Sequence, residues 1–259
     1  MEAQLLVTVI SLLFLCFTWY LKQEVAPKVK GYIGELSISL RLKRLSKKRY
    51  IVLNDVLLKI AESSTQIDHI VISKSGIYVI ETKNLKGWIH GHENSEYWKQ
   101  TIYHQKYSFK NPVKQNSIHV HALRRILSDY PHIKYHPIVV LTGSAVLKNV
   151  TNWSPVIYSN QLIRAIREDS KETNLSFDQM IHIADRLKSL RLRGKKENRK
   201  HVQRIRKKER ENLTSDTCPS CGNYLIKRKG RFGEFYGCSG YPKCKYSQAI
   251  EDTSSKGRW

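Results

Sequence analysis

The sequence is poor in acidic residues and has no cysteine across most of its length. Only 22 Asp and Glu residues stand against 45 Lys and Arg in 259 residues, so the formal net charge is +23. This excess excludes an acidic or charge-neutral soluble enzyme and favours a polyanionic partner, either nucleic acid or an anionic membrane surface. Four of the five cysteines follow residue 217, and the fifth is Cys16. This distribution argues against a disulfide scaffold and for a reducing compartment.

The N-terminal segment contains an uncharged run, Leu5–Leu21, that ends with the aromatic pair Trp19 and Tyr20. As a helix it would reach roughly 25 Å, at the short end of what spans a bilayer core. Three lysines follow it: Lys22, Lys28 and Lys30. The positive-inside rule keeps such a flank in the cytoplasm. We therefore predict an uncleaved single-pass transmembrane anchor within residues 1–27, with the bulk of the chain cytoplasmic. The alternatives are a cleaved signal peptide and a buried helix.

The rest of the chain predicts an α/β fold. Helical spacing of apolar residues is found in 30–49, 111–128, 161–168 and 177–193. Strand-like runs occupy 50–60, 66–73, 77–82, 88–92, 97–101, 136–142 and 156–158. This order favours one mixed sheet flanked by helices, with residues 28–145 as its main domain and 146–194 completing or extending it.

A strongly basic segment follows this domain. Residues 186–211 contain thirteen Lys or Arg residues against three Glu, which gives a net charge of about +10. The segment is interpreted either as a solvated helical linker, over 195–216, or as an arm that contacts phosphates, and charge alone does not decide between the two.

The central part of the sequence predicts a β-hairpin that opposes two carboxylates. With a two-residue turn after Ser73, Asp68 lies opposite Glu81, and a bulged turn would shift this register by one. Because side chains alternate, Asp68, Glu81 and Lys83 share one face with apolar neighbours. Two carboxylates at roughly 5 Å repel each other, and a cation relieves the repulsion. Oxygen-only ligands suit Mg²⁺ or Mn²⁺. The alternative is an ordinary surface ion pair of Glu81 and Lys83.

Several short motifs along this region together resemble the nuclease-related domain (NERD) family. They are Gly31-x-x-Gly34-Glu35, Gln66-x-Asp68-His69-Ile70, Gly76-Ile77-Tyr78-Val79-Ile80-Glu81-Thr82-Lys83-Asn84, Gly87-x-Ile89-x-Gly91 and Asn111-Pro112-x-x-Gln115. The resemblance covers roughly residues 28–145. One departure is Ile67, where the related pattern has Pro before the Asp.

The resemblance implies a fold similar to the PD-(D/E)xK restriction-endonuclease-like superfamily and metal-assisted hydrolysis of phosphodiester bonds. It implies Asp68 and Glu81 as ligands of Mg²⁺ or Mn²⁺ and Lys83 as the catalytic amine that positions the attacking water. Glu35 is implied as a supporting acid near the metal, and Gln115 as a supporting polar group.

Three histidines lie within or close to these motifs. His69 points to the opposite face of its strand from Asp68, so we expect it to be structural. His119 and His121 lie two residues apart on a helix, which makes joint metal ligation improbable.

The C-terminal tail has the spacing of a zinc site. Cys218, Cys221, Cys238 and Cys244 form the pattern C-x2-C-x16-C-x5-C. Four thiolates on two short turns fit a closed tetrahedral Zn²⁺ site, and a module of about 35 residues needs such a metal to fold. The alternatives are free thiols or two disulfides.

The tail also resembles the C4 zinc finger at the C-terminus of type IA topoisomerases, through the run Gly233-Glu234-Phe235-Tyr236-Gly237-Cys238-Ser239-Gly240-Tyr241-Pro242-Lys243-Cys244. The resemblance implies binding of single-stranded DNA by residues 217–259. Independently, aromatic and basic residues interleave here, which suits base stacking and backbone contact. The predicted nucleic-acid-binding residues are Lys227, Arg228, Lys229, Arg231, Phe235, Tyr236, Tyr241, Lys243 and Lys245.

Three hypotheses follow for the whole chain. The first is a membrane-anchored, cytosol-facing nuclease that a zinc ribbon brings to DNA, in preference to RNA. The second is a membrane-tethered nucleic-acid-binding protein that keeps the NERD fold without catalysis. The third makes the basic surface a binder of anionic lipid, but it leaves the zinc module unexplained.

Overall fold

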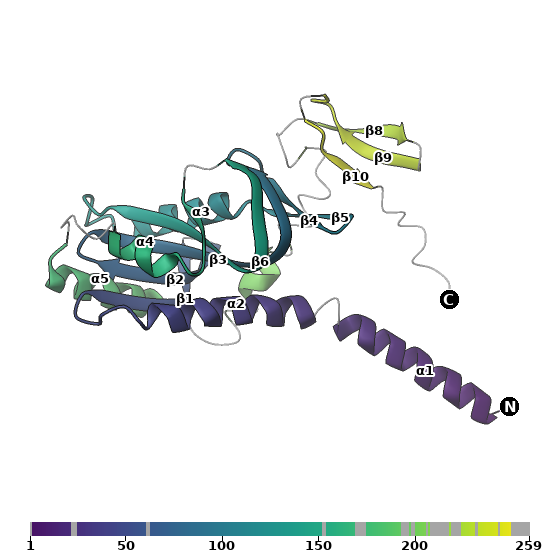
Figure 1. The fold of residues 1–259 in the computed structure, drawn as a ribbon, viewed down its shortest axis with the longest axis horizontal. Coiled ribbons are helices and arrows are strands. Elements are labelled where there is room, and N and C mark those ends of the chain that lie inside the picture. Colours follow the sequence, from purple (N-terminus) through teal and green to yellow (C-terminus); the bar gives the residue numbers. More distant parts are fainter. Residues whose placement is uncertain are drawn as a thin grey trace.

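The computed structural model describes residues 2–21, 25–60, 63–151, 154–168, 175–192, 197, 200–205, 207, 218, 224–230, 233–242 and 244–249. Its larger part is a mixed sheet with helices on both faces, which confirms the predicted α/β class (Figure 1). Its smaller part is a three-stranded antiparallel sheet near the C-terminus.

The large sheet has seven strands. They are β1 (Tyr50–Ile60), β2 (Ser63–Ser73), β3 (Gly76–His92), β4 (Tyr97–Ile102), β5 (Gln105–Lys110), β6 (Tyr135–Thr151) and β7 (Val156–Tyr158). Strands β1 to β5 follow one another as antiparallel neighbours, whereas β6 pairs in parallel with both β3 and β7. β3 is therefore the central strand: β6 lines one of its edges over nearly its whole length.

Besides a helical stretch at residues 200–205, the described part of the chain contains five labelled helices. They are α1 (Glu2–Tyr20), α2 (Ala26–Leu42), α3 (Pro112–Ile126), α4 (Leu162–Glu168) and α5 (Phe177–Leu190). α2 and α4 pack on one face of the sheet, where Ile38, Leu42, Leu162 and Ile166 share a core with Tyr78 and Ile80 of β3. α3 and α5 pack on the other face, against Ile70, Ile72, Ile77 and Val79.

Local sequence explains where two of these helices start. Asn111 caps α3 by accepting hydrogen bonds from the backbone of Val113 and Lys114, and Pro112 supplies a pre-set helical φ. The Asn111 amide also donates to three carbonyls of the β3–β4 connection, of which the shortest bond is 2.8 Å to Ser95. α5 begins with a capping box of Ser176 and Gln179.

The predicted hairpin register is confirmed. Ser73 lies opposite Gly76 and His69 opposite Ile80, as a two-residue turn requires. Gly76 adopts φ of +135°, and a Cβ there would lie 2.2 Å from the carbonyl oxygen of Lys134, so only glycine fits this turn.

The predicted transmembrane anchor is not supported. The run Leu5–Leu21 does form most of α1. However, no helix among the described residues is long and apolar enough to cross a membrane.

The small sheet consists of β8 (Leu225–Gly230), β9 (Gly233–Cys238) and β10 (Ser247–Ala249), in the order β10-β9-β8. β8 and β9 carry five of the predicted nucleic-acid-binding residues: Lys227, Arg228, Lys229, Phe235 and Tyr236. The hairpin of β8 and β9 places Lys227 opposite Tyr236 and Arg228 opposite Phe235.

Candidate metal centre and nucleic-acid interface

The acidic site lies beside β3, between the part of this strand that pairs with β2 and the part that pairs with β4. β2 pairs with β3 only as far as Ile80, and β4 joins the same strand from Trp88 onward. Just past the last β2 pair, the backbone N–H of Thr82 donates to Oδ2 of Asp68 at 2.7 Å instead of to a strand carbonyl. The Asp68 side chain thus closes the ladder, and this bond holds its carboxylate beside β3.

Glu81 is the most enclosed acid of the site, with 5% of its surface exposed. Its Oε1 lies 2.7 Å from Nζ of Lys83 and its Oε2 lies 3.1 Å from Nε2 of His119. Burial alone would raise the pKa of Glu81, but the Lys83 ammonium and the His119 hydrogen bond lower it to about 2. Glu81 is therefore ionised at neutral pH.

The negative charge of Glu81 affects the pKa values of both Asp68 and Glu35. Burial, followed by repulsion from Glu81, raises the pKa of Asp68 well above its usual range. Burial and the charges of Asp55 and Glu81 also raise the pKa of Glu35. Gly34 permits this approach of α2, since a Cβ there would lie 2.9 Å from both Cβ of Asn84 and Oγ1 of Thr142. The structure therefore places Glu35, Asp68, Glu81 and Lys83 in one electrostatic group.

His119 belongs to this site, although the sequence gave it no role beside Glu81. Its Nδ1 lies 2.7 Å from the hydroxyl of Thr65 while its Nε2 faces Glu81, so both ring nitrogens are used within the protein. That His119 and His121 do not ligate a metal together stays a prediction. One signal was available: His119 lies one helical turn after Gln115, on the same face of α3.

Gln115 and Asn116 behave differently on α3. Asn116 is fully buried and donates to the carbonyls of Val79 and Ile138, which pins the helix across β3 and β6. Oε1 of Gln115 is buried and has no hydrogen-bond partner among the described residues. An orphaned amide oxygen on the His119 face fits a site that receives a hydrated cation or another donor.

The donor set fits a hard divalent cation, because carboxylate and amide oxygens are the ligands that Mg²⁺ and Mn²⁺ prefer. Asp68 and Glu81 would hold the cation. Among the described residues, however, only a cysteine group has three candidate ligand atoms within 4.8 Å of one another. The acidic group is thus not gathered into a closed three-ligand cage.

His69 and the basic linker border the site. His69 is buried with Nδ1 2.8 Å from Oδ1 of Asn54, and burial lowers its pKa to about 4, so the ring is neutral at pH 7. In the linker, His201 is 7% exposed and its Nδ1 lies 2.8 Å from the hydroxyl of Ser64. Burial and the charges of Arg204 and His119 lower the pKa of His201. This part of the linker therefore packs on β2 beside Thr65 rather than being solvated throughout.

Three of the four predicted zinc ligands come together. Their sulfur atoms lie within 4.8 Å of one another, with 3.7 Å between Sγ of Cys218 and Sγ of Cys244. The third is Cys238, whose Sγ also accepts a hydrogen bond from the Gly240 backbone at 3.3 Å. Cys221 lies outside the described residues. A cluster of this size and softness fits a structural Zn²⁺ ion.

The small sheet exposes part of the predicted nucleic-acid interface. Tyr241 is 61% exposed and the guanidinium of Arg228 stands 5.7 Å from its ring centre. Phe235 is half-buried, whereas Tyr236, Lys229 and Lys245 are exposed. Lys227 instead pairs with Glu234 at 2.7 Å, so part of its charge is neutralised. The remaining two predicted residues, Arg231 and Lys243, lie outside the described residues.

Removing the negative charge of Asp68 should stabilise the metal-free protein at neutral pH. A raised pKa means that protonation of Asp68 favours folding; this stabilisation is complete below the ordinary pKa and is lost as pH rises through the raised one. Asp68→Asn mimics the protonated form and keeps the acceptor for Thr82. We expect it to increase unfolding free energy by on the order of 1 kcal/mol, measured by thermal melting in EDTA.

The same experiment reports on the metal. Adding Mg²⁺ should raise the Tm of the unaltered protein and leave that of Asp68→Asn unchanged. Asp178→Asn on the surface of α5 removes the same charge and serves as the control. Equal Mg²⁺ effects on both variants would count against Asp68 as a ligand.

Both parts of the chain are similar to known protein families. A family model described as the nuclease-related domain matches residues 30–142, and one described as the topoisomerase DNA-binding C4 zinc finger matches residues 215–253. The chain is 35% identical over 190 residues to an uncharacterized protein of Bacillus anthracis, which covers 70% of this chain and 86% of that protein.

The C-terminal part is similar to segments of DNA topoisomerase 1 from two archaea. It is 54% identical over 35 residues to that of Methanothermobacter thermautotrophicus and 54% over 41 residues to that of Methanocaldococcus jannaschii. These matches cover 14% and 16% of this chain and 5% of each topoisomerase. No solved structure matches the chain significantly.

Proposed function

Since the chain belongs to one family with the Bacillus anthracis protein and carries a nuclease-related domain followed by a topoisomerase-type C4 zinc finger, we propose that it is a metal-dependent nuclease acting on DNA. The observation that carries this proposal is the group formed by Asp68, Glu81 and Lys83 where β2 and β3 part. Buried like charges are costly unless a bound cation or a reaction uses them. We propose as well that the large domain has the restriction-endonuclease-like fold that this activity uses.

Each residue has a role in this reaction. Asp68 and Glu81 would hold Mg²⁺ or Mn²⁺, and the bound ion would supply Lewis-acid chemistry for phosphodiester hydrolysis. His119 fixes one oxygen of Glu81, so the other faces Lys83. Although burial opposes it, the negative charge of Glu81 raises the pKa of Lys83. Lys83 therefore acts as a cation that orients the water or stabilises phosphate charge, and not as a base.

The zinc ribbon would bring DNA to this site. Exposed Tyr236 and Tyr241 offer stacking surfaces, while Arg228, Lys229 and Lys245 offer charge for the backbone. Stacking of this kind favours single strands, because bases of a duplex present no free ring faces. Zn²⁺ is the structural ion of this module.

A second candidate function is binding of nucleic acid without cleavage. The observation that favours it is that both Glu81 oxygens already have partners, Lys83 and His119. Such a centre could be a neutralised structural cluster.

Incubation of the full chain with single-stranded and duplex DNA and RNA, in Mg²⁺, Mn²⁺ or EDTA, separates the two. Cleavage that requires the divalent ion supports the nuclease. Tight binding with no cleavage under any of these conditions supports the second candidate.

We also propose that α1 attaches the protein to a membrane, with the rest of the chain in the cytoplasm. α1 exposes a dense apolar surface, on which Leu13, Phe14 and Trp19 are each at least 64% exposed. Lysines follow it, as the cytoplasmic flank of a membrane segment does. The full chain should sediment with membranes after alkaline carbonate washing, and deletion of residues 2–21 should release it. Recovery of the full chain in the soluble fraction would contradict the attachment.

A further inference from the structure

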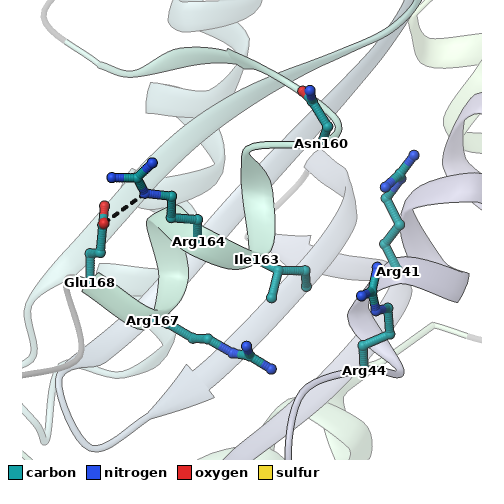
Figure 2. Close-up of a pocket in the computed structure, with 7 residues that line it drawn as sticks. All are labelled: Arg41, Arg44, Asn160, Ile163, Arg164, Arg167 and Glu168. Atoms are coloured by element: carbon teal, nitrogen blue, oxygen red, sulfur yellow. Dashed lines mark hydrogen bonds and ion pairs between the residues drawn. The ribbon is translucent and has the colours of Figure 1, made fainter.

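A second basic feature lies between the end of α2 and α4. It is a pocket of ≈ 430 Å³ whose lining includes four arginines: Arg41, Arg44, Arg164 and Arg167 (Figure 2). Ile163 lies between the two helices, and Asn160 stands just before α4. Figure 2 shows Arg167 extending towards the α2 side, while Arg164 is turned away from it.

The core fixes the walls of this arginine pocket. Leu42 of α2 and Leu162 and Ile166 of α4 are fully buried in one cluster, so the two helices are held at a set separation. The arginines occupy neighbouring positions that face out of that core. α2 also carries Glu35, but no residue that lines the pocket belongs to the acidic site, so the two are separate.

The pocket has an excess of positive charge. Among the described residues that line it, the acidic one is Glu168, which is paired with Arg164 at 2.7 Å. No carboxylate of the described residues pairs with Arg41 or Arg44. Guanidinium groups that share a recess repel one another, and a bound anion relieves that repulsion.

The chemistry of the pocket favours a phosphate. Guanidinium groups form bidentate hydrogen bonds with phosphate oxygens, and the cations among the described lining residues are all arginines. The pocket is a recess with the Glu168 carboxylate on its rim. Such a recess suits a phosphate of a flexible nucleic-acid strand better than it suits the flat surface of an anionic bilayer. The net charge of +23 and the DNA-type zinc finger point to the same polymer.

We propose that the arginine pocket binds backbone phosphates of the nucleic acid, as a contact separate from both the acidic site and the zinc ribbon. The proposal rests on the nucleic-acid function proposed above. It assigns Arg41, Arg44 and Arg167 to substrate binding and not to the chemical step.

The test uses the full chain in detergent and fluorescence anisotropy of a labelled single-stranded DNA oligonucleotide. Arg41→Ala/Arg44→Ala should weaken binding roughly tenfold and reduce the slope of log affinity against log salt by about 1.4, because two phosphate contacts are lost. Arg41→Lys/Arg44→Lys should recover most of the slope but only part of the affinity. The control variant Lys74→Ala/Arg125→Ala removes two exposed charges outside the pocket. It should change the affinity and the salt slope less than the pocket variant does.

Cleavage and vesicle binding are measured in parallel. The pocket variant should raise KM with kcat unchanged, whereas a failure of the nuclease proposal would leave wild type without cleavage and the anisotropy result intact. Unchanged DNA affinity and salt slope would overturn the proposal. The proposal would also be overturned if the pocket variant kept its DNA affinity but lost its preference for phosphatidylglycerol vesicles over phosphatidylcholine vesicles. The pocket would then bind lipid.

Discussion

Replacing Lys83 with Ala is expected to lower kcat for DNA cleavage by 10²- to 10⁴-fold while KM changes little. This is the usual effect of losing one positioned group that acts in the transition state. Binding of DNA depends on the zinc ribbon and the basic surface, which the substitution leaves in place. The measurement is single-turnover cleavage with Mg²⁺ and excess enzyme. Lys86→Ala, an exposed lysine on the same strand, is the matched control and should retain full activity.

Folding must be separated from catalysis in this test. Lys83→Ala leaves the buried Glu81 without its cation, which is destabilising in itself. The double variant Glu81→Gln/Lys83→Met removes both charges together, so no buried charge is left unpaired. It should fold and remain inactive. Full activity of this double variant would show that the reaction is carried out elsewhere.

Removal of zinc has the second large expected effect. Cys244→Ser, or prolonged chelation, should release the bound Zn²⁺ and unfold the small sheet, because the binding energy of a structural zinc is on the order of 10 kcal/mol or more and is also its folding energy. Affinity for single-stranded DNA should fall at least tenfold as the stacking surface is lost. Metal content by mass spectrometry and anisotropy measure the two effects.

The control is Cys16→Ser, which changes the one cysteine outside the tail. It should keep both the zinc and the DNA affinity. The melting of the large domain should be the same in both cysteine variants, since the cysteine cluster belongs to the small module. If Cys244→Ser keeps its zinc, or loses it with DNA affinity unchanged, the role given to this module is wrong.

Local patterns accounted for much of the fold. The alternation and the two-residue turn predicted the β2–β3 register, and helical spacing with Asn111-Pro112 predicted α3. Four strands of the large sheet are longer than predicted or additional: β2 begins at Ser63, β3 runs without interruption to His92, β6 reaches Thr151, and β5 follows β4 as a further strand. The sequence did not mark these because the extra segments are half-exposed, so they lack the apolar runs by which strands are recognised.

The acidic site shows the same division. Asp68, Glu81 and Lys83 were predictable because a hairpin relates them through a short turn. His119 was not, since its contact with Glu81 depends on where α3 crosses β3, and Asn116 and the Asn111 cap set that crossing. The packing of His201 beside Ser64 likewise joins residues 137 positions apart.

By itself, therefore, the sequence determined what short-range geometry can determine: the opposed carboxylates of a hairpin and the cysteine spacing of a zinc module. Only the tertiary structure decided that His119 joins that hairpin from α3, and that arginines from the end of α2 and from α4 line one pocket. These groups are far apart along the chain, so their proximity comes from burial of the apolar faces of the helices on the sheet, which no local pattern of charges records.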